Sequence, residues 1–153
     1  MKAIFCLVVL ALASCASDEV LEVRQFHLRD TEVERDYYDR SNENQFIRGE
    51  INKRVHGAVT QKERDARKGD YYTVSWKRLS GANPVRVVFE CRQATSGSRV
   101  KKMDRKLPAA VSGKTEFQII GNDFLNKGRV TAWRMSLYDG SQKLATKTSY
   151  LWD

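Results

Sequence analysis

The amino-acid sequence predicts an all-β protein built as an antiparallel β-sandwich, with one short surface helix near residues 60–68. Three observations support this prediction. Most of the chain alternates apolar and polar residues with a period of two, which is typical of half-buried strands. Seven or eight such segments follow one another, with short turns between them. They are not separated by long helical patterns, which argues against a parallel α/β sheet.

The first part of the chain has a weaker strand pattern. One strand is expected at residues 20–28, and the polar residues 31–45 are expected to form a long loop. In residues 47–59 the odd positions are mostly apolar or glycine, but the apolar residues also recur at the helical spacing of four. Gly49 and Gly57 would weaken a helix, so we expect a strand in this segment.

Residues 60–68 carry a start and a stop signal for a helix. Thr60 is followed three positions later by Glu63, which is the spacing of a capping box, and Gly69 stands where a helix would end. Ala66 is the one apolar residue in this segment. We therefore expect a helix of about two turns that lies on the surface.

The strand pattern is strongest from residue 70 onward. Two expected strands have clear apolar faces, formed by Tyr72, Val74 and Trp76 and by Val85, Val87, Phe89 and Cys91. Further strands are expected at residues 100–107 and around Phe117 and Ile119, the latter ending at residues 121–123. Cys91 is the single cysteine that remains beyond residue 15, so we expect a buried structural thiol rather than a disulfide.

The last unit is expected to be a hairpin. Residues 130–138 and 142–152 flank the dipeptide Asp139-Gly140, which favours a type I′ turn. The resulting set of short antiparallel strands resembles the layered architecture of immunoglobulin and fibronectin domains. The sequence lacks the pair of cysteines of antibody domains, so the resemblance concerns the architecture alone. A small β-barrel is the alternative.

The N-terminus resembles a bacterial lipoprotein signal peptide. Residues 3–13 are uncharged and apolar, and as a helix they would extend only about 16 Å, which is too short to cross a bilayer. They end in Leu12-Ala13-Ser14-Cys15, which resembles the lipobox of bacterial lipoproteins. This resemblance implies that Cys15 becomes the lipidated N-terminus. Ala16 follows it in place of aspartate, which implies an outer-membrane lipoprotein facing the periplasm. Plain secretion after cleavage at Ala16 is the alternative.

These features divide the chain into a signal peptide (1–14), a lipidated N-terminus with the first strand and the polar loop (15–45), and a main β domain (46–153), to which the strand at 20–30 belongs. The body also resembles small uncharacterised exported bacterial proteins. The segments that carry this resemblance are Arg-x-x-Gly-Ala-Val at 54–59 and residues 69–76, 131–134 and 149–152. It implies no activity and no site residues.

The charge distribution suggests where an anionic partner could bind. The formal net charge is +8, and most basic residues are interleaved with acids. A cluster of five is opposed only by Asp104, and it consists of Arg99, Lys101, Lys102, Arg105 and Lys106. It predicts either a lysine-protected edge strand or a patch for anionic lipid or glycan. Nucleic acid is not an expected partner of an exported protein. Tyr150 and Trp152 share a phase in the last strand and are the expected face for a protein partner.

The sequence lacks the common catalytic and metal-binding motifs. It has two histidines, His27 and His56, and contains no HExxH, no CxxC, no glycine-rich phosphate loop and no Gly-x-Ser-x-Gly. We therefore expect no metal, no cofactor and no enzymatic activity. The sequence predicts an exported, lipid-anchored binding or structural module of the bacterial envelope. A polyanion-binding module is the alternative, and a hydrolase that uses Asp36, Asp39 and His56 is the third hypothesis. The oligomeric state stays open.

Overall fold

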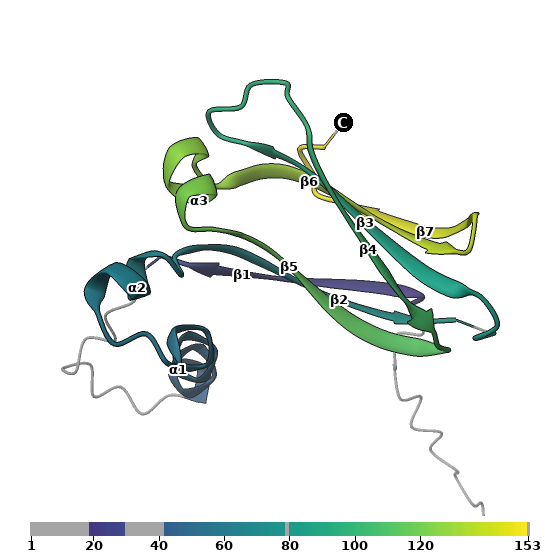
Figure 1. Cartoon of the computed structure of the whole chain (residues 1–153), viewed down its shortest axis with the longest axis horizontal. Coiled ribbons are helices and arrows are strands. Elements are labelled where there is room, and N and C mark those ends of the chain that lie inside the picture. Colours follow the sequence, from purple (N-terminus) through teal and green to yellow (C-terminus); the bar gives the residue numbers. More distant parts are fainter. Residues whose placement is uncertain (1–18, 30–41, 79, 153) are drawn as a thin grey trace, which may run out of the picture.

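The computed structural model describes residues 19–29, 42–78 and 80–152. Within these ranges the chain forms seven strands and three helices. Figure 1 shows that the strands form two layers, one above the other. The strands are β1 (Leu21–Leu28), β2 (Gly69–Lys77), β3 (Pro84–Gln93), β4 (Lys101–Ala109), β5 (Ser112–Ile120), β6 (Val130–Asp139) and β7 (Gln142–Thr148).

The strand order is that of an immunoglobulin-like sandwich. All pairings are antiparallel, and the two sheets have the orders β1-β2-β5 and β4-β3-β6-β7. The first, second and fifth strands thus face the third, sixth and seventh, as in immunoglobulin domains. β4 lies beside β3, whereas the fourth strand of constant-type domains joins the other sheet. The predicted antiparallel β-sandwich is confirmed. The alternative of a closed barrel is wrong, because the two sheets remain separate.

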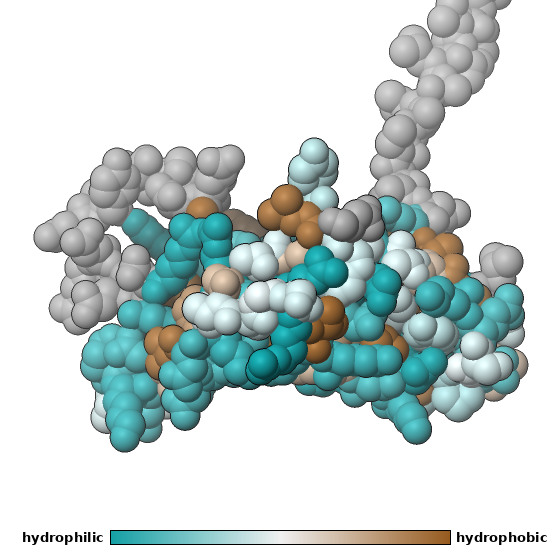
Figure 2. Space-filling model, turned by 90° about the horizontal axis from the view of Figure 1, so that it is seen from above, coloured by the Kyte–Doolittle hydropathy of each residue, from teal (hydrophilic) through white to brown (hydrophobic). Residues whose placement is uncertain are grey.

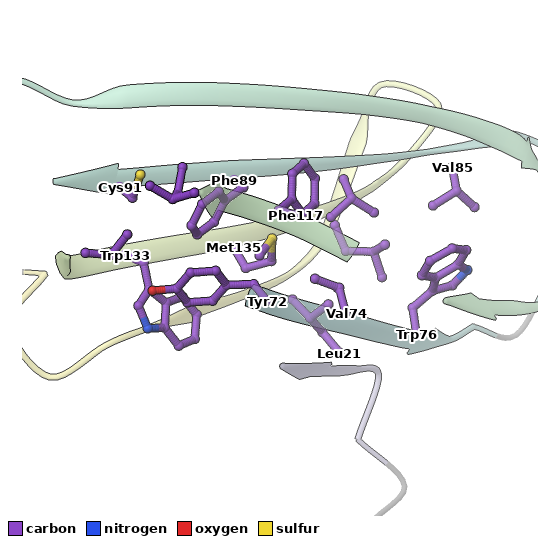
Figure 3. Close-up of a cluster of buried hydrophobic side chains, with 14 residues drawn as sticks. Leu21, Tyr72, Val74, Trp76, Val85, Phe89, Cys91, Phe117, Trp133 and Met135 are labelled. Carbon is purple, nitrogen blue, oxygen red and sulfur yellow. The ribbon is translucent and has the colours of Figure 1, made fainter. Parts of the chain in front are cut away.

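The core lies between the sheets and is rich in aromatic side chains (Figure 3). The ring of Tyr72 from β2 lies 4.6 Å from that of Phe89 and 5.8 Å from that of Trp133, both in the other sheet. Phe117 from β5 packs on Phe89 with ring centroids 5.4 Å apart. The apolar faces predicted for residues 72–76 and 85–91 both point into this core.

Cys91 is one of these core residues and is a free thiol. Only 1% of it is exposed, as predicted for a structural cysteine. Burial raises the pKa of the thiol to about 11, and thiolate is the reactive form of cysteine. Cys91 is therefore unreactive at neutral pH.

The strand predicted at residues 47–59 is wrong, because α1 (Asn42–Val55) is a helix. The helical spacing of Ile47, Ile51 and Val55 prevails there over the alternation. Gly57 lies just beyond the end of the helix with φ +82°, so it terminates the helix rather than interrupting it. Of the predicted polar loop at 31–45, residues 42–45 belong to α1 and residues 31–41 lie outside the described residues.

The predicted surface helix is confirmed as α2 (Gln61–Asp65). The Thr60 side chain accepts the N–H of Glu63, and the Glu63 carboxylate accepts the N–H of Thr60, so the capping box is complete. A third helix, α3 (Asn122–Lys127), follows Gly121 where only a turn was expected. It packs against β2 and β5 at one end of the sandwich.

The C-terminal hairpin is confirmed, but its turn is displaced by one residue. Asp139 pairs with Gln142, so Gly140 and Ser141 are the central residues of the turn. Only Gly140 has positive φ, at +56°, which fits a type II′ turn and not the predicted type I′. β7 ends at Thr148 instead of continuing to residue 152, and the Trp152 N–H closes a turn onto the Ser149 carbonyl at 3.2 Å.

The outer face of the three-stranded sheet is partly covered by α1, which Figure 1 shows beneath that sheet. Arg54 makes this contact. Its guanidinium lies 4.7 Å from the ring centroid of Phe26 and 4.3 Å from that of Tyr71, and it pairs with Glu50 and Glu116 at 3.1 and 3.3 Å. The side chain of Arg54 is only 6% exposed, so this cation is buried between α1 and the sheet and is not available to a ligand.

The predicted signal peptide and Cys15 lie outside the described residues. Among the residues that are described, no helix has the length and hydrophobicity needed to cross a bilayer.

Candidate binding sites

The five basic residues predicted as one anion-binding patch are divided between the two sides of β4. Side chains alternate along a strand, and Met103 and Leu107 of β4 pack against the core. Arg105 shares their side, with its guanidinium 5.5 Å from the centroid of the buried Phe117 ring. Lys101 also lies on this side and is ion-paired with Asp123 of α3. Lys102 and Lys106 therefore point to the outer face, on either side of Asp104.

Arg99 lies apart from this outer face as well. It precedes β4, and its N–H donates to the Ser96 carbonyl at 3.1 Å within a turn. The structure therefore does not bring the predicted five residues together. Of the five, Lys102 and Lys106 share the outward side of β4.

Strand pairing places other cations next to these two lysines. Arg86 of β3 is opposite both Lys106 of β4 and Tyr138 of β6. Glu90 of β3 is likewise opposite both Lys102 and Arg134. The outer face of the four-stranded sheet therefore carries a group of residues that we call the basic face: Arg86, Arg92, Lys102, Lys106, Arg134 and Lys143, with Asp104, Glu90, Tyr138 and Trp152.

Each of two aromatic side chains on the basic face contacts two cations. The Tyr138 ring has the Arg86 guanidinium 4.1 Å and the Lys143 ammonium 5.7 Å from its centroid. The Trp152 ring has the guanidinium groups of Arg92 and Arg134 4.8 and 4.9 Å from its centroid. Such cation–π contacts fix long side chains that would otherwise be mobile, so these cations are held in place before any ligand binds.

The basic face has more positive than negative groups. Arg86 pairs with Asp104 at 3.3 Å, and Arg134 pairs with Glu90 at 2.8 Å. The hydrogen bond from Arg134 lowers the pKa of the Glu90 carboxyl, so Glu90 stays ionised. Among the described residues of the basic face, the six cations still exceed the two carboxylates by four charges. Figure 2 views the molecule from the side of this sheet, and the surface there is mainly hydrophilic.

Tyr150 and Trp152 do not form the shared face that was predicted for them. β7 has ended before these residues, so they follow a turn and not the alternation of a strand. Tyr150 is 98% exposed, whereas Trp152 is only 7% exposed because the two arginines cover it. Tyr150 remains a candidate for contact with a protein partner, whereas Trp152 packs beneath two arginines of the basic face.

A cleft of about 460 Å³ lies at the end of the sandwich next to α3. His27 of β1 and Asp70 of β2 are register partners, and the His27 Nδ1 lies 2.5 Å from the Asp70 carboxylate. The other carboxylate oxygen of Asp70 accepts the Val130 N–H of β6 at 2.6 Å. Asp70 is 2% exposed, so a buried charge joins both sheets at this point.

The His27 ring is better exposed than its partner, with 41% of the side chain accessible. Because an ionised carboxylate only accepts hydrogen bonds, Nδ1 is the donor and Nε2 is left for the cleft. Two further cations, Arg29 and Arg129, line the same cleft. No sequence motif singles out Asp70, Arg29 or Arg129. The one available signal was an isolated acid at the start of the otherwise apolar β2.

The acidic residues proposed for a hydrolase cannot be placed. Asp36 and Asp39 lie outside the described residues, and His56 is an exposed residue just after α1. Within the described part of the chain, no group of three or more His, Cys, Asp or Glu side chains could hold a metal ion.

Comparison with known proteins adds little to these observations. No protein family matches the chain, and no curated protein matches it either. Among solved structures, the chain is similar to an immunoglobulin-like protein from Pseudomonas aeruginosa, with 14% identity and a TM-score of 0.36. The match covers 52% of this chain and 69% of the other. The assignment of an immunoglobulin-like sandwich therefore rests on the strand order and not on this match.

Proposed function

We propose that the protein is an exported, non-enzymatic binding module of the bacterial envelope that attaches to anionic surfaces through its basic face. The observation that carries this proposal is the surplus of four positive charges on one sheet face. Immunoglobulin-like sandwiches commonly present binding surfaces on a rigid scaffold, and a flat sheet face suits an extended partner. The two cation–aromatic clusters support the proposal, because they hold the charges at fixed spacing.

The sequence at residues 12–15, which resembles a lipobox, supports the proposed location in the bacterial envelope. A basic surface would add electrostatic attraction to anionic headgroups to the attachment that acyl chains on Cys15 provide. An anionic glycan of the envelope presents the same chemistry to this face. Both partners predict binding that weakens steeply as salt is added, because the charges act through solvent.

The basic face can be tested with matched charge variants. The variant Lys102→Ser, Lys106→Ser, Lys143→Ser removes three exposed lysines from the face. The control Lys53→Ser, Lys62→Ser, Lys114→Ser removes three exposed lysines from α1, α2 and β5, on the side of the other sheet. At about 1 kcal/mol per lysine, we expect the first variant to bind phosphatidylglycerol vesicles roughly 100-fold more weakly than the unsubstituted protein.

The control should retain most of the binding to these vesicles in sedimentation assays. If both variants lose the same affinity, net charge alone matters and the proposed face is wrong. Heparin in place of the vesicles distinguishes a glycan partner from a lipid partner.

The proposed export is tested by the intact mass of the protein extracted from bacterial membranes with detergent. We expect a chain that begins at Cys15 and carries acyl groups. An unmodified chain that begins near residue 17 would show that the protein is secreted without a lipid anchor. A full-length chain in the soluble cell fraction would contradict both.

A further inference from the structure

The geometry points to a binding site for a small organic anion in the cleft between His27 and Arg129, separate from the basic face. The ligand class is an oxyanion, either a carboxylate or a phosphate ester, attached to a flat apolar group. This inference does not depend on export or on the basic face, because the cleft lies at one end of the sandwich. Its lining comes from β1, β2, α3 and β6, from Arg29 and Arg129 next to these elements, and from the segment after β7.

The charges of the cleft favour an anion. Arg29 and Arg129 bring two positive charges to its lining, and both are exposed. Among the described residues of the lining, the only acid is Asp70, whose two oxygens are already used by His27 and by the Val130 N–H. The two arginines outnumber this one carboxylate, so the described lining of the cleft has a net positive charge. Guanidinium groups are the side chains best suited to bind carboxylate and phosphate oxygens.

His27 gives the cleft a fixed hydrogen-bonding group. His27 lines the cleft, and its contact with Asp70 is made through Nδ1, so Nε2 is the ring nitrogen that Asp70 does not engage. Nε2 can accept a hydrogen bond from a ligand O–H or, when the ring is charged, donate one to an oxyanion. Ser149 adds a hydroxyl group, and its oxygen already accepts the Trp133 N–H at 2.9 Å, which positions it.

The remaining walls are apolar and suit the body of the ligand. Phe124 of α3, Trp133 of β6 and Leu151 line the cleft. Leu151 is 62% exposed, although it lies against this cleft, and an apolar ligand would cover it. A volume of about 460 Å³ falls within the range of small-molecule sites, which are mostly apolar with a few convergent polar groups.

The test is isothermal titration of the purified protein with four probes. Phenyl phosphate and benzoate carry an oxyanion on a flat apolar group, benzyl alcohol lacks the charge, and inorganic phosphate lacks the apolar group. We expect at least one of the two aromatic anions to bind and both other probes to bind at least tenfold more weakly. The stronger of the two anions identifies the phosphate or the carboxylate as the preferred headgroup.

Matched variants locate the site. Arg129→Gln should weaken binding of the preferred probe about tenfold, which is the loss expected for one charge-assisted hydrogen bond. Arg24→Gln is the control, because Arg24 is an exposed arginine that does not line this cleft. It should change the affinity by less than about twofold.

Absence of binding by both aromatic anions up to roughly 10 mM would overturn the inference. Equal effects of Arg129→Gln and Arg24→Gln would also overturn it, because binding would then depend on the overall charge of the protein and not on this cleft. The triple lysine variant of the basic face should bind the probe as well as the unsubstituted protein does. Failure of the basic-face proposal is therefore distinguishable from failure of this one.

Discussion

The two ends of β2 contain buried charges of opposite sign. At one end, the side chain of Arg78 is 3% exposed and donates to the carbonyls of Ala110 and Asn83 at 2.7 and 2.6 Å and to the Asp139 carboxylate at 2.6 Å. At the other end, Asp70 is 2% exposed and joins β1 to β6 through His27 and the Val130 N–H. Both charges connect segments that are far apart in the sequence.

The two buried charges differ in whether one of their hydrogen-bonding partners can also contact a ligand. Two acceptors of Arg78, the carbonyls of Ala110 and Asn83, lie in interstrand connections, and the third is the carboxylate of Asp139, the last residue of β6. One of the two partners of Asp70 is a partly exposed imidazole that has a second nitrogen. The Arg78 guanidinium therefore holds its end of the sandwich together. The Asp70 carboxylate instead orients His27, which is still partly exposed to solvent. The comparison suggests that stability depends more on Arg78 and binding more on the Asp70 end.

The largest expected effect is at Arg78. Arg78→Met should lower the free energy of unfolding by about 3–5 kcal/mol, because it leaves buried acceptors and a carboxylate without their cation. Arg78→Lys should lose most of the same stability, since an ammonium cannot reach three acceptors in the geometry of the guanidinium fork. Urea denaturation measures both changes. A loss below about 1 kcal/mol in Arg78→Met would show that Arg78 does not hold this end.

A smaller effect is expected at the opposite end. Asp70→Ala should cost about 2–3 kcal/mol, because the Val130 N–H is left buried and unpaired. His27→Gln should cost less than about 1 kcal/mol, since that side chain is partly exposed. Amide hydrogen exchange separates the two changes, and the Val130 amide should lose protection in Asp70→Ala but keep it in His27→Gln. Equal loss of protection in both variants would mean that His27 supports the sandwich as much as Asp70 does.

The smallest effect is a dependence on pH near the cleft. Burial opposes ionisation of Asp123, but the ammonium groups of Lys101 and Lys127 outweigh it and lower the pKa of that carboxyl. A lowered pKa contributes stability above the ordinary carboxyl value of 3.8, and this stability is lost as the pH falls through the lowered value.

The variant Lys101→Met brings the Asp123 pKa closer to that ordinary value. The unsubstituted protein should therefore lose more stability on acidification than Lys101→Met, by up to about 1 kcal/mol. Denaturation at neutral pH and again below pH 4 measures the difference. Parallel losses in the two proteins would exclude a contribution from this ion pair.

The sandwich was predictable because the alternation of residues 70–91 and 130–138 reports directly which side of a strand is buried. The helix α1 is harder to predict, because its apolar residues fit both periods and a glycine such as Gly57 can either interrupt a helix or end it. Its φ of +82° identifies it as the end of the helix, and a glycine just past the last periodic residue is a known stop signal. The conformational freedom of glycine is compatible with both a disrupted helix and a helix end, and only the backbone angles distinguish the two.

The candidate sites were less predictable, because they depend on pairing between distant strands. Lys102 and Lys106 are close in sequence and were identified, but Arg86 and Lys143 join them only through the register of β3 and the β6–β7 hairpin. Local sequence does not show that α3 supplies an acid to Lys101 or that Arg105 lies over Phe117, so it groups both residues with Lys102 and Lys106. The contact of His27 with Asp70 likewise depends on the pairing of β1 with β2.

The direction of β1 fixes which end of the molecule is reached first from the N-terminus. Leu21 pairs with Trp76 near the Arg78 end, and Leu28 pairs with Gly69 beside the cleft, so the strand spans about 25 Å between the two ends. An ion pair of 2.7 Å between Glu19 and Lys147 holds the entering chain to β7. A chain that enters at Leu21 therefore reaches the Arg78 end of the sandwich first. A ligand in the cleft would bind at the opposite end, remote from Leu21.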